Sequence, residues 1–513
     1  MRLAGAPGGC AAIPPATETA ADLIAVAAAG VARTGFQALW SRTPLQVGEF
    51  LRRRFNLSFS FTGGTMARNA SLILIALLMI AGLAAGRPAL AAGPSDAAPE
   101  TGVNGTHFDA GAATAAYLAT LSPQARARSD AYFEGGYWLI LWDFLVTLAV
   151  ALLLLGAGWS GRMRDVAERL TRIKALQTIL YALQYLLLTA LLTLPWAAYQ
   201  GYFREHQYGM SNQTGLAWLV DQGKGLAVGL ILGSVAITAI YAVIRRSPRN
   251  WWVWGTLVAV ALLLVQVAIT PTLLEPVFNR FYPLPDGPVK QQILSMARAN
   301  GIPVGQVFEF DASKQTTRIS AHVSGLFGSA QISVNDNLMK RASPEEVRAV
   351  VGHEMGHYVL NHIDKSVIDL GLVVLVGFRF LSWAFDRLAA RYGPRWRLRG
   401  VADTAGLPLL LALFSAYGFL MTPVLNSITR AMEIEADAFG LNAARQPDGA
   451  AQAALHLSEY RKLQPGPVEE FVFFDHPSGW NRIHRAMLWK AENIDAADIA
   501  AYDAAHHPPG STR

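Results

Sequence analysis

Charged residues are scarce in this sequence of 513 residues. Asp, Glu, Lys and Arg together make up 16% of it, whereas a typical soluble domain carries about 25%. Cysteine is nearly absent as well, because Cys10 stands alone; this excludes an intramolecular disulfide, a multi-cysteine zinc site and a CxxC redox pair. Hydrophobic residues reach 52%, which excludes an intrinsically disordered chain. The composition therefore favours a membrane protein over a series of soluble domains.

Long apolar stretches support the same conclusion. A helix needs roughly 20 apolar residues to span a bilayer, and rings such as Trp251 and Trp252 stand at the ends of several stretches, as they do at a membrane interface. The stretches lie at about 71–85, 137–159, 175–199, 225–244, 251–270, 367–385 and 404–425. Buried helices of a soluble core do not account for so many in one chain. The pattern predicts a mainly α, polytopic helical membrane protein with six or seven spanning helices.

The first stretch differs from the others. The segment starts at Met66 with the basic residue Arg68, continues with an apolar centre, and ends in an Ala-x-Ala cleavage-site pattern near residue 91. This order is typical of a secretory signal. We interpret 66–91 as a signal peptide or, alternatively, as an uncleaved first membrane anchor. Residues 1–65 carry no comparable signal, so they are interpreted as a non-native extension, with Met66 as the expected start.

The chain then alternates between spanning and polar segments. Ser343 at the cap position and an acid at the third helical position form a capping box, and Pro344 occupies the first helical position. Together they predict the start of a strong helix. Before it, the sequence predicts a helix at 289–299 and strands at 307–310, 320–326 and 331–334. The predicted division is a linker with a short helix (92–136), four spans (137–271), an α+β segment (272–365), two spans (366–425), a C-terminal segment (426–491) and a tail (492–513).

The helix after Ser343 carries the motif His353-Glu354-Met-Gly-His357. Histidines at positions i and i+4 share one face of a helix, so both imidazoles can reach one metal ion. Glu354 stands beside the first histidine, where it can take the proton of an attacking water as general base. Chance alone gives about one HExxH in a hundred chains of this composition. The motif predicts that 272–365 is a zincin-like α+β catalytic segment inserted between spanning helices.

A hydrolytic zinc needs a third protein ligand, and two candidates follow the motif. His362 is rejected, because a continuous helix would place it about 140° away from His357. Glu433 is preferred, and Asp437 shares its helical face, where it can orient a histidine ligand or assist proton transfer. Glu435 is expected to be a surface acid. From the residues alone, an ordinary helix ion pair with Arg430 accounts for the presence of Glu433 as well as a metal-ligand role does.

Several further motifs accompany these residues. The sequence resembles the type I CAAX prenyl protease family of integral-membrane zinc endopeptidases, over about residues 122–488. The similarity rests on HExxH followed by two hydrophobic spans and ExxAD, on the segments 208–214 and 275–285, on Asn426-x-x-Thr-Arg430, and on His476-Pro-x4-Arg482.

The resemblance implies a specific set of functional residues. It implies one Zn²⁺ per chain, bound by His353, His357 and Glu433, with Glu354 as general base and Asp437 as proton donor. It also implies that His476 and Arg482 face the substrate or the oxyanion. Substrate binding is assigned to Ser320, Ala321 and Asn426.

One position departs from the family pattern. The strand that pairs with substrate usually carries an Asn-Ala pair, where this chain has Ser320-Ala321. Pairing through main-chain groups survives such a change, whereas the side-chain hydrogen bond of the asparagine does not.

The predicted function is hydrolysis of peptide bonds in peptides or membrane-associated proteins, as CAAX-type processing or membrane-protein quality control. The expected partners are an extended peptide and the lipid bilayer, without nucleic acid. One alternative is a transporter or channel, which would need charges inside its spans; Asp143, Asp369 and Arg379 are the candidates. The other alternative is a pseudoprotease that binds clients without cutting them.

Basic loops predict the orientation in the membrane. Lys and Arg accumulate in cytoplasmic loops, which accounts for the net charge of +6. Three loops that share one side by parity are basic: 160–174, 245–249 and 387–399. The HExxH segment would then face outward, in a bacterial inner membrane. Analogy with the eukaryotic relatives, which work from the cytosolic face, argues the other way.

Overall fold

The computed structural model describes residues 108–325, 330–495 and 498–499. Six helices in this part of the chain are long and apolar enough to cross a membrane, so the prediction of a mainly helical, multi-pass protein is confirmed. They correspond to the six apolar stretches predicted from residue 137 onward. The predicted extension at 1–65, the signal or anchor at 66–91 and most of the tail at 492–513 lie outside the described residues.

The spanning helices are longer than the apolar stretches that predicted them. They are α5 (Pro123–Gly156), α7 (Lys174–Ala198), α9 (Gly215–Arg246), α10 (Trp251–Ile269), α15 (His362–Trp396) and α16 (Leu407–Ala444). Helix α5 begins well before the apolar run, because Ser122 caps it by accepting from the backbone N–H of Ala125 and Pro123 takes the first helical position. Residues 123–136, predicted as linker, are therefore its first turns; the predicted short helix is α4 (Ala110–Ala119).

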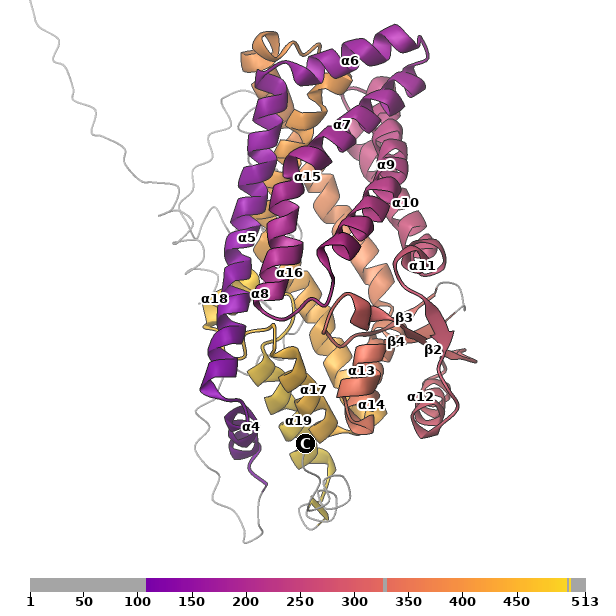
Figure 1. Ribbon diagram of the computed structural model, residues 1–513, viewed down its shortest axis with the longest axis vertical. Helices are drawn as coiled ribbons and strands as arrows, with labels where there is room; N and C mark the ends of the chain where they lie inside the picture. Colours follow the sequence, from indigo (N-terminus) through magenta and orange to yellow (C-terminus); the bar gives the residue numbers. More distant parts are fainter. Residues whose placement is uncertain (1–107, 326–329, 496–497, 500–513) are drawn as a thin grey trace, which may run out of the picture. The chain divides into compact units, whose positions relative to one another are not determined.

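Two spans continue through short π-helical turns. Helix α7 passes through Tyr199–Arg204 into α8 (Glu205–Gln207), and α10 passes through Thr270–Leu274 into α11 (Glu275–Phe278). A further helix, α6 (Trp159–Leu170), was not predicted; it lies across one end of the spanning helices (Figure 1).

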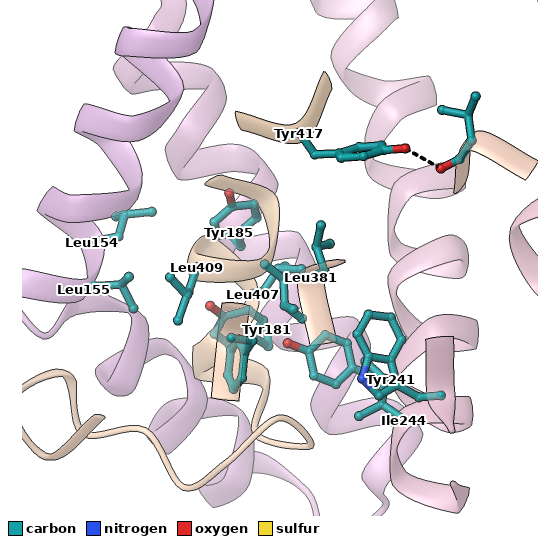
Figure 2. Close-up of a cluster of buried hydrophobic side chains, with 14 of the residues drawn as sticks. Leu154, Leu155, Tyr181, Tyr185, Tyr241, Ile244, Leu381, Leu407, Leu409 and Tyr417 are labelled. Carbon is teal, nitrogen blue, oxygen red and sulfur yellow. Dashed lines mark hydrogen bonds between the residues drawn. The ribbon is translucent and has the colours of Figure 1, made fainter. Parts of the chain in front are cut away.

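Apolar side chains from several spans form a common core. Leu154 and Leu155 of α5, Tyr181 of α7 and Leu409 of α16 belong to it (Figure 2). The buried Tyr417 hydroxyl donates to the carbonyl oxygen of Val373 at 2.8 Å, which satisfies a polar group that would otherwise be costly in an apolar interior. This core holds α15 and α16 together within the bundle.

A four-stranded sheet lies toward the other end of these helices (Figure 1). Its order is β1 (Phe281–Pro283), β2 (Val307–Phe310), β4 (Gln331–Asn335) and β3 (Ala321–Ser324). The pairs β1–β2 and β3–β4 are antiparallel, and β2–β4 is parallel, with Val307 opposite Ile332. The three predicted strands are present and β1 is an addition. Because β3 ends the order, it is an edge strand.

Helices surround the sheet within the described residues; the first and the last begin within one residue of their predicted starts, and the middle one was not predicted. They are α12 (Pro288–Ala299), α13 (Asp336–Arg341) and α14 (Pro344–Val359). Ser343 and Glu346 form the predicted capping box of α14. Ile332 and Val334 of the sheet share one apolar core with Val351 and Met355 of α14. The sheet and the motif-bearing helix are thus one packed unit.

The last spanning helix and the predicted C-terminal segment are not separate. Helix α16 runs without interruption from the span to Ala444, so the predicted boundary at residue 425 lies inside a helix. It is followed by α17 (Pro447–Leu457), α18 (Pro467–Phe473) and α19 (Gly479–Asn493). The side chain of Glu433 therefore stands on a helix that is rooted in the membrane bundle.

Helices α14 and α16 approach each other along a seam of small residues. A Cβ added to Gly356 would lie 3.1 Å from the Cα of Ala436, and one added to Gly440 would lie 2.8 Å from the backbone nitrogen of His353. No residue larger than glycine fits position 440 without moving a helix. The seam sets the distance between the motif residues of α14 and the acidic residues of α16.

Replacing Gly440 by Ala should destabilise the protein, because overpacking of a close contact costs about 1–3 kcal/mol. The expected result is a lower Tm of the detergent-solubilised protein. Gly418→Ala is the matched control on the same helix, since nothing lies within 4 Å of its added Cβ; its Tm should not fall. Equal Tm values for Gly440→Ala and the unaltered protein would contradict the role of the seam.

Candidate metal centre

Three side chains from α14 and α16 converge on one point. One ligand atom from each of His353, His357 and Glu433 lies within 4.8 Å of the others. The Nε2 atoms of the two histidines are 3.2 Å apart, and Glu433 Oε2 lies 3.1 Å from His353 Nε2. Helical spacing places the histidines together, and the α14–α16 seam brings the carboxylate to them.

The alternative partner of Glu433 is engaged elsewhere. Arg430 donates to the carbonyl oxygen of Glu470 at 2.9 Å and to that of Phe474. The interpretation of Glu433 as a helix ion-pair partner of Arg430 is therefore wrong.

These residues fit a divalent metal ion. Glu433 Oε2 is buried and forms no hydrogen bond within the described chain, although imidazole nitrogens of His353 and His476 lie 3.1 and 3.2 Å away. A buried carboxylate oxygen that faces two imidazole nitrogens without a hydrogen bond to either leaves lone pairs unused. A divalent cation bound between these groups would accept them.

The first histidine is held by a carboxylate on its other ring nitrogen. His353 Nδ1 lies 2.8 Å from Asp437 Oδ1. Arg482 donates to the same carboxylate from Nε at 3.0 Å and from Nη2 at 2.6 Å. Both oxygens of Asp437 are thus occupied, which suits a carboxylate that orients a ligand.

The carboxylate of Glu354, next to the first histidine, has the properties of a general base. Within the described ranges its carboxylate has no hydrogen-bond or ion-pair partner, and the residue is only partly buried. Burial raises the pKa of Glu354 above its usual value, against the opposing effect of the neighbouring imidazoles of His353 and His357. A raised pKa brings a carboxylate closer to the strength that a general base needs near neutral pH.

His476 also reaches the cluster, from the segment between α18 and α19. Its Nε2 lies 3.2 Å from Glu433 Oε2 and its Nδ1 lies 2.8 Å from Asp475 Oδ1. Arg482, in contrast, directs its guanidinium at Asp437. Of the two residues expected to face substrate, only His476 lies beside the ligand group itself.

The three predicted substrate-binding residues lie in two places. Ser320 and Ala321 stand at the start of the edge strand β3, where the backbone N–H of Asn335 donates to the carbonyl oxygen of Ser320 at 2.9 Å. Asn426 donates its amide to the carbonyl oxygen of Val472 at 2.8 Å. This bond ties α16 to α18, so the structure gives Asn426 a structural partner.

The continuous helix assumed for His362 is wrong. Helix α14 ends at Val359 and Asn361 adopts a left-handed conformation (φ 54°), so α15 starts anew at His362. The ring of His362 consequently turns back, with Nδ1 2.9 Å from His357 Nδ1 and Nε2 3.1 Å from Glu435 Oε2. Glu435 is partly exposed, as expected of a surface acid, and it pairs with His362 and Lys365. The asparagine, a residue that tolerates left-handed backbone, was the signal in the sequence.

The fold and the site together define a membrane metallopeptidase. The model of peptidase family M48 matches residues 283–490, and that of the CAAX prenyl protease N-terminal region, described as five membrane helices, matches 112–280. An uncharacterized metalloprotease of Bacillus subtilis, YhfN, is 30% identical over 361 residues, covering 68% of this chain and 84% of that relative. A rice CAAX prenyl protease 1 homolog is 26% identical over 325 residues, covering 62% and 75%.

A solved structure has the same fold. The crystal structure of S. mikatae Ste24p aligns with a TM-score of 0.62 at 20% identity, covering 82% of this chain and 96% of that one. The chain belongs to the M48 family and, within it, to the CAAX prenyl protease group of membrane metalloproteases. The predicted resemblance is confirmed, and so is the prediction of a peptide-hydrolysing enzyme.

Replacing Glu433 by Ala should remove the bound metal together with activity, because two imidazoles do not complete a three-ligand set. Glu354→Gln should abolish cleavage and keep the metal, because Glu354 is not among the converging atoms. Metal content per chain, measured by atomic emission on purified protein, checks both. Full occupancy in Glu433→Ala protein would overturn this choice of third ligand.

Proposed function

We propose that the chain binds one zinc ion through His353, His357 and Glu433 and hydrolyses internal peptide bonds of extended, membrane-associated substrates. The convergence of these three ligand atoms carries the proposal. When bound, zinc supplies Lewis acidity to the water and to the scissile carbonyl. The carboxylate of Glu354, next to His353 in the sequence, supplies the general base.

The residues around the cluster divide the reaction between them. Glu354 accepts a proton from the attacking water as the oxygen bonds to the carbonyl carbon, and later delivers it to the leaving amine nitrogen. His476, whose Nδ1 lies 2.8 Å from Asp475 Oδ1, donates from Nε2 to the oxyanion in its imidazolium form, in which both ring nitrogens carry hydrogen.

Asp437 has a positioning role in this proposal rather than that of proton donor. Its two oxygens are already occupied by His353 and by the guanidinium of Arg482, so it is ionised and has no proton to give. Arg482 acts through Asp437 by fixing that carboxylate. Asn426 acts at a further remove, by holding α18 against α16.

The edge strand β3 is the proposed substrate platform. An extended peptide can add to an exposed sheet edge through main-chain hydrogen bonds, and β3 has a partner on one side only. Ser320 and Ala321 would then contact the peptide near its entry to the cluster. This mode suits unfolded tails, as in CAAX-type processing or quality control of membrane proteins.

Two of the charged residues that suggested a transporter make contacts between helices. Asp143 accepts from Trp196 Nε1 at 2.7 Å and from Gln200 Nε2 at 2.6 Å, and the guanidinium of Arg379 lies over the ring of Trp252. Both are contacts that stabilise helix packing.

Cleavage of an unstructured peptide by the purified protein tests the function. We expect cuts within the peptide that a chelator abolishes and added zinc restores, and no cuts with Glu354→Gln protein. Parallel peptides with and without a C-terminal isoprenyl group separate the two substrate classes. Cleavage that persists in Glu354→Gln protein would contradict the mechanism.

The proposed orientation places the cluster outside the cytoplasm of a bacterial inner membrane. The basic loops gather at the end that carries α6, where buried Arg164 donates to Asp403 at 2.7 Å and Arg399 pairs with Glu168. Helix α14, which carries His353 and His357, lies toward the opposite end (Figure 1), and short basic loops remain cytoplasmic.

Alkaline phosphatase fused after Arg513 should therefore be active, and green fluorescent protein fused there should stay dark. Insertions after Pro248, between α9 and α10, are the control and should give the opposite pair of results. Fluorescence at Arg513 combined with active phosphatase at Pro248 would reverse the assignment.

A further inference from the structure

A chain of polar contacts extends from the second histidine of the cluster to the protein surface. His357 Nδ1 lies 2.9 Å from His362 Nδ1, and His362 Nε2 lies 3.1 Å from Glu435 Oε2. Lys365 then donates to the same oxygen of Glu435 at 2.5 Å. The side chain of His362 is 4% exposed and that of Glu435 39%, so the chain leads from the interior to solvent.

The fold builds this chain from three helices. The left-handed turn at Asn361 folds the first residue of α15 back onto the last turn of α14, so that the rings of His357 and His362 meet edge to face at 4.9 Å between centroids. Helix α16 contributes Glu435, two residues after Glu433. The same helix therefore supplies a metal-binding carboxylate and the end of the polar chain.

The contacts admit one arrangement of protons when His357 binds metal through Nε2. Its Nδ1 must then carry hydrogen, and His362 Nδ1 must accept it. The remaining hydrogen of a neutral His362 sits on Nε2 and is donated to Glu435, whose charge Lys365 balances. In the opposite tautomer, the N–H of His362 Nδ1 would face the N–H of His357 Nδ1 at 2.9 Å. The lone pair of His362 Nε2 would then face the carboxylate of Glu435.

We propose that His362 and Glu435 are positioning residues that hold His357 in its metal-binding tautomer and orientation. The inference rests on the proposed ligand role of His357. Asp437 serves His353 directly, whereas the carboxylate that serves His357 acts through an inserted imidazole. Partners of this kind raise metal affinity because they fix the ring and increase its basicity.

Amide substitution distinguishes this role from simple packing. In His362→Gln, the amide oxygen can accept from His357 Nδ1 while the amide nitrogen donates to Glu435; His362→Leu keeps the bulk and removes both bonds. The zinc dissociation constant, measured by chelator competition on the full-length protein, should rise about 10–100-fold in His362→Leu. In His362→Gln it should stay within about threefold of the original, since both bonds are retained.

Glu435 and a distant histidine complete the set of variants. Glu435→Gln keeps an acceptor for His362 and should bind zinc better than Glu435→Leu. His456→Leu is the matched control, because His456 pairs with Glu346 at 3.0 Å on the same helix α14 but does not touch the cluster. It should leave the zinc dissociation constant unchanged, even if its Tm falls.

Cobalt substitution gives an independent signal. The visible absorption of bound Co²⁺ should shift in His362→Leu and stay in place in His362→Gln, because it reports ligand geometry and not stability. An unchanged zinc constant and cobalt spectrum in His362→Leu would overturn the proposal. If that variant does not fold, unchanged values in Glu435→Leu would overturn it equally.

His357→Ala distinguishes failure of the positioning role of His362 from failure of the proposed ligand role of His357. Loss of zinc in His357→Ala, together with unchanged affinity in His362→Leu, refutes the polar chain alone. Retention of zinc in His357→Ala refutes the ligand assignment itself.

Discussion

The close packing of α14 against α16 is the constraint on which the site depends. At Gly440 the two backbones come so near that a single Cβ would lie 2.8 Å from the nitrogen of His353. Because rigid helices carry both sets of residues, this one contact fixes where Glu433 meets the two histidines. It also brings Asp437 to His353 and Glu435 to His362. A wider helix spacing would separate ligands and supporting residues together.

The membrane bundle gives that contact its rigidity. Helix α16 is continuous from the apolar core to the cluster, and α15 begins at His362, within hydrogen-bonding distance of His357. Both helices are anchored far from the site, through the buried core around Tyr181 and Leu409 and through the buried pair of Arg164 and Asp403. The proposed ligands therefore stand on elements whose positions are set by apolar burial, which is the largest favourable contribution to folding.

The small sheet adds what the helices lack. Its inner residues pack on α14, while its last strand, β3, keeps one edge free of other strands. Main-chain groups at such an edge recognise an extended peptide without regard to most side chains. Under the proposed substrate role of β3, Ser320-Ala321 in place of the Asn-Ala pair changes side-chain contacts to the peptide and keeps main-chain pairing available.

The sequence alone determined the features that depend on local spacing and composition. Apolar length predicted the spanning helices, the capping box predicted the start of α14, and the i, i+4 rule placed His353 and His357 on one face. Position 433 was an open choice between a ligand and a partner of Arg430 until the family resemblance was considered.

Only the tertiary structure decided the contacts between residues far apart in the chain. Arg482 meets Asp437, His362 turns back to His357, and the last span continues into the segment that carries Glu433. The first two depend on helix packing and on one left-handed residue, Asn361, and neither is encoded in a repeating local pattern. A periodic pattern fixes the face of a helix, whereas packing of the whole chain decides what that face meets.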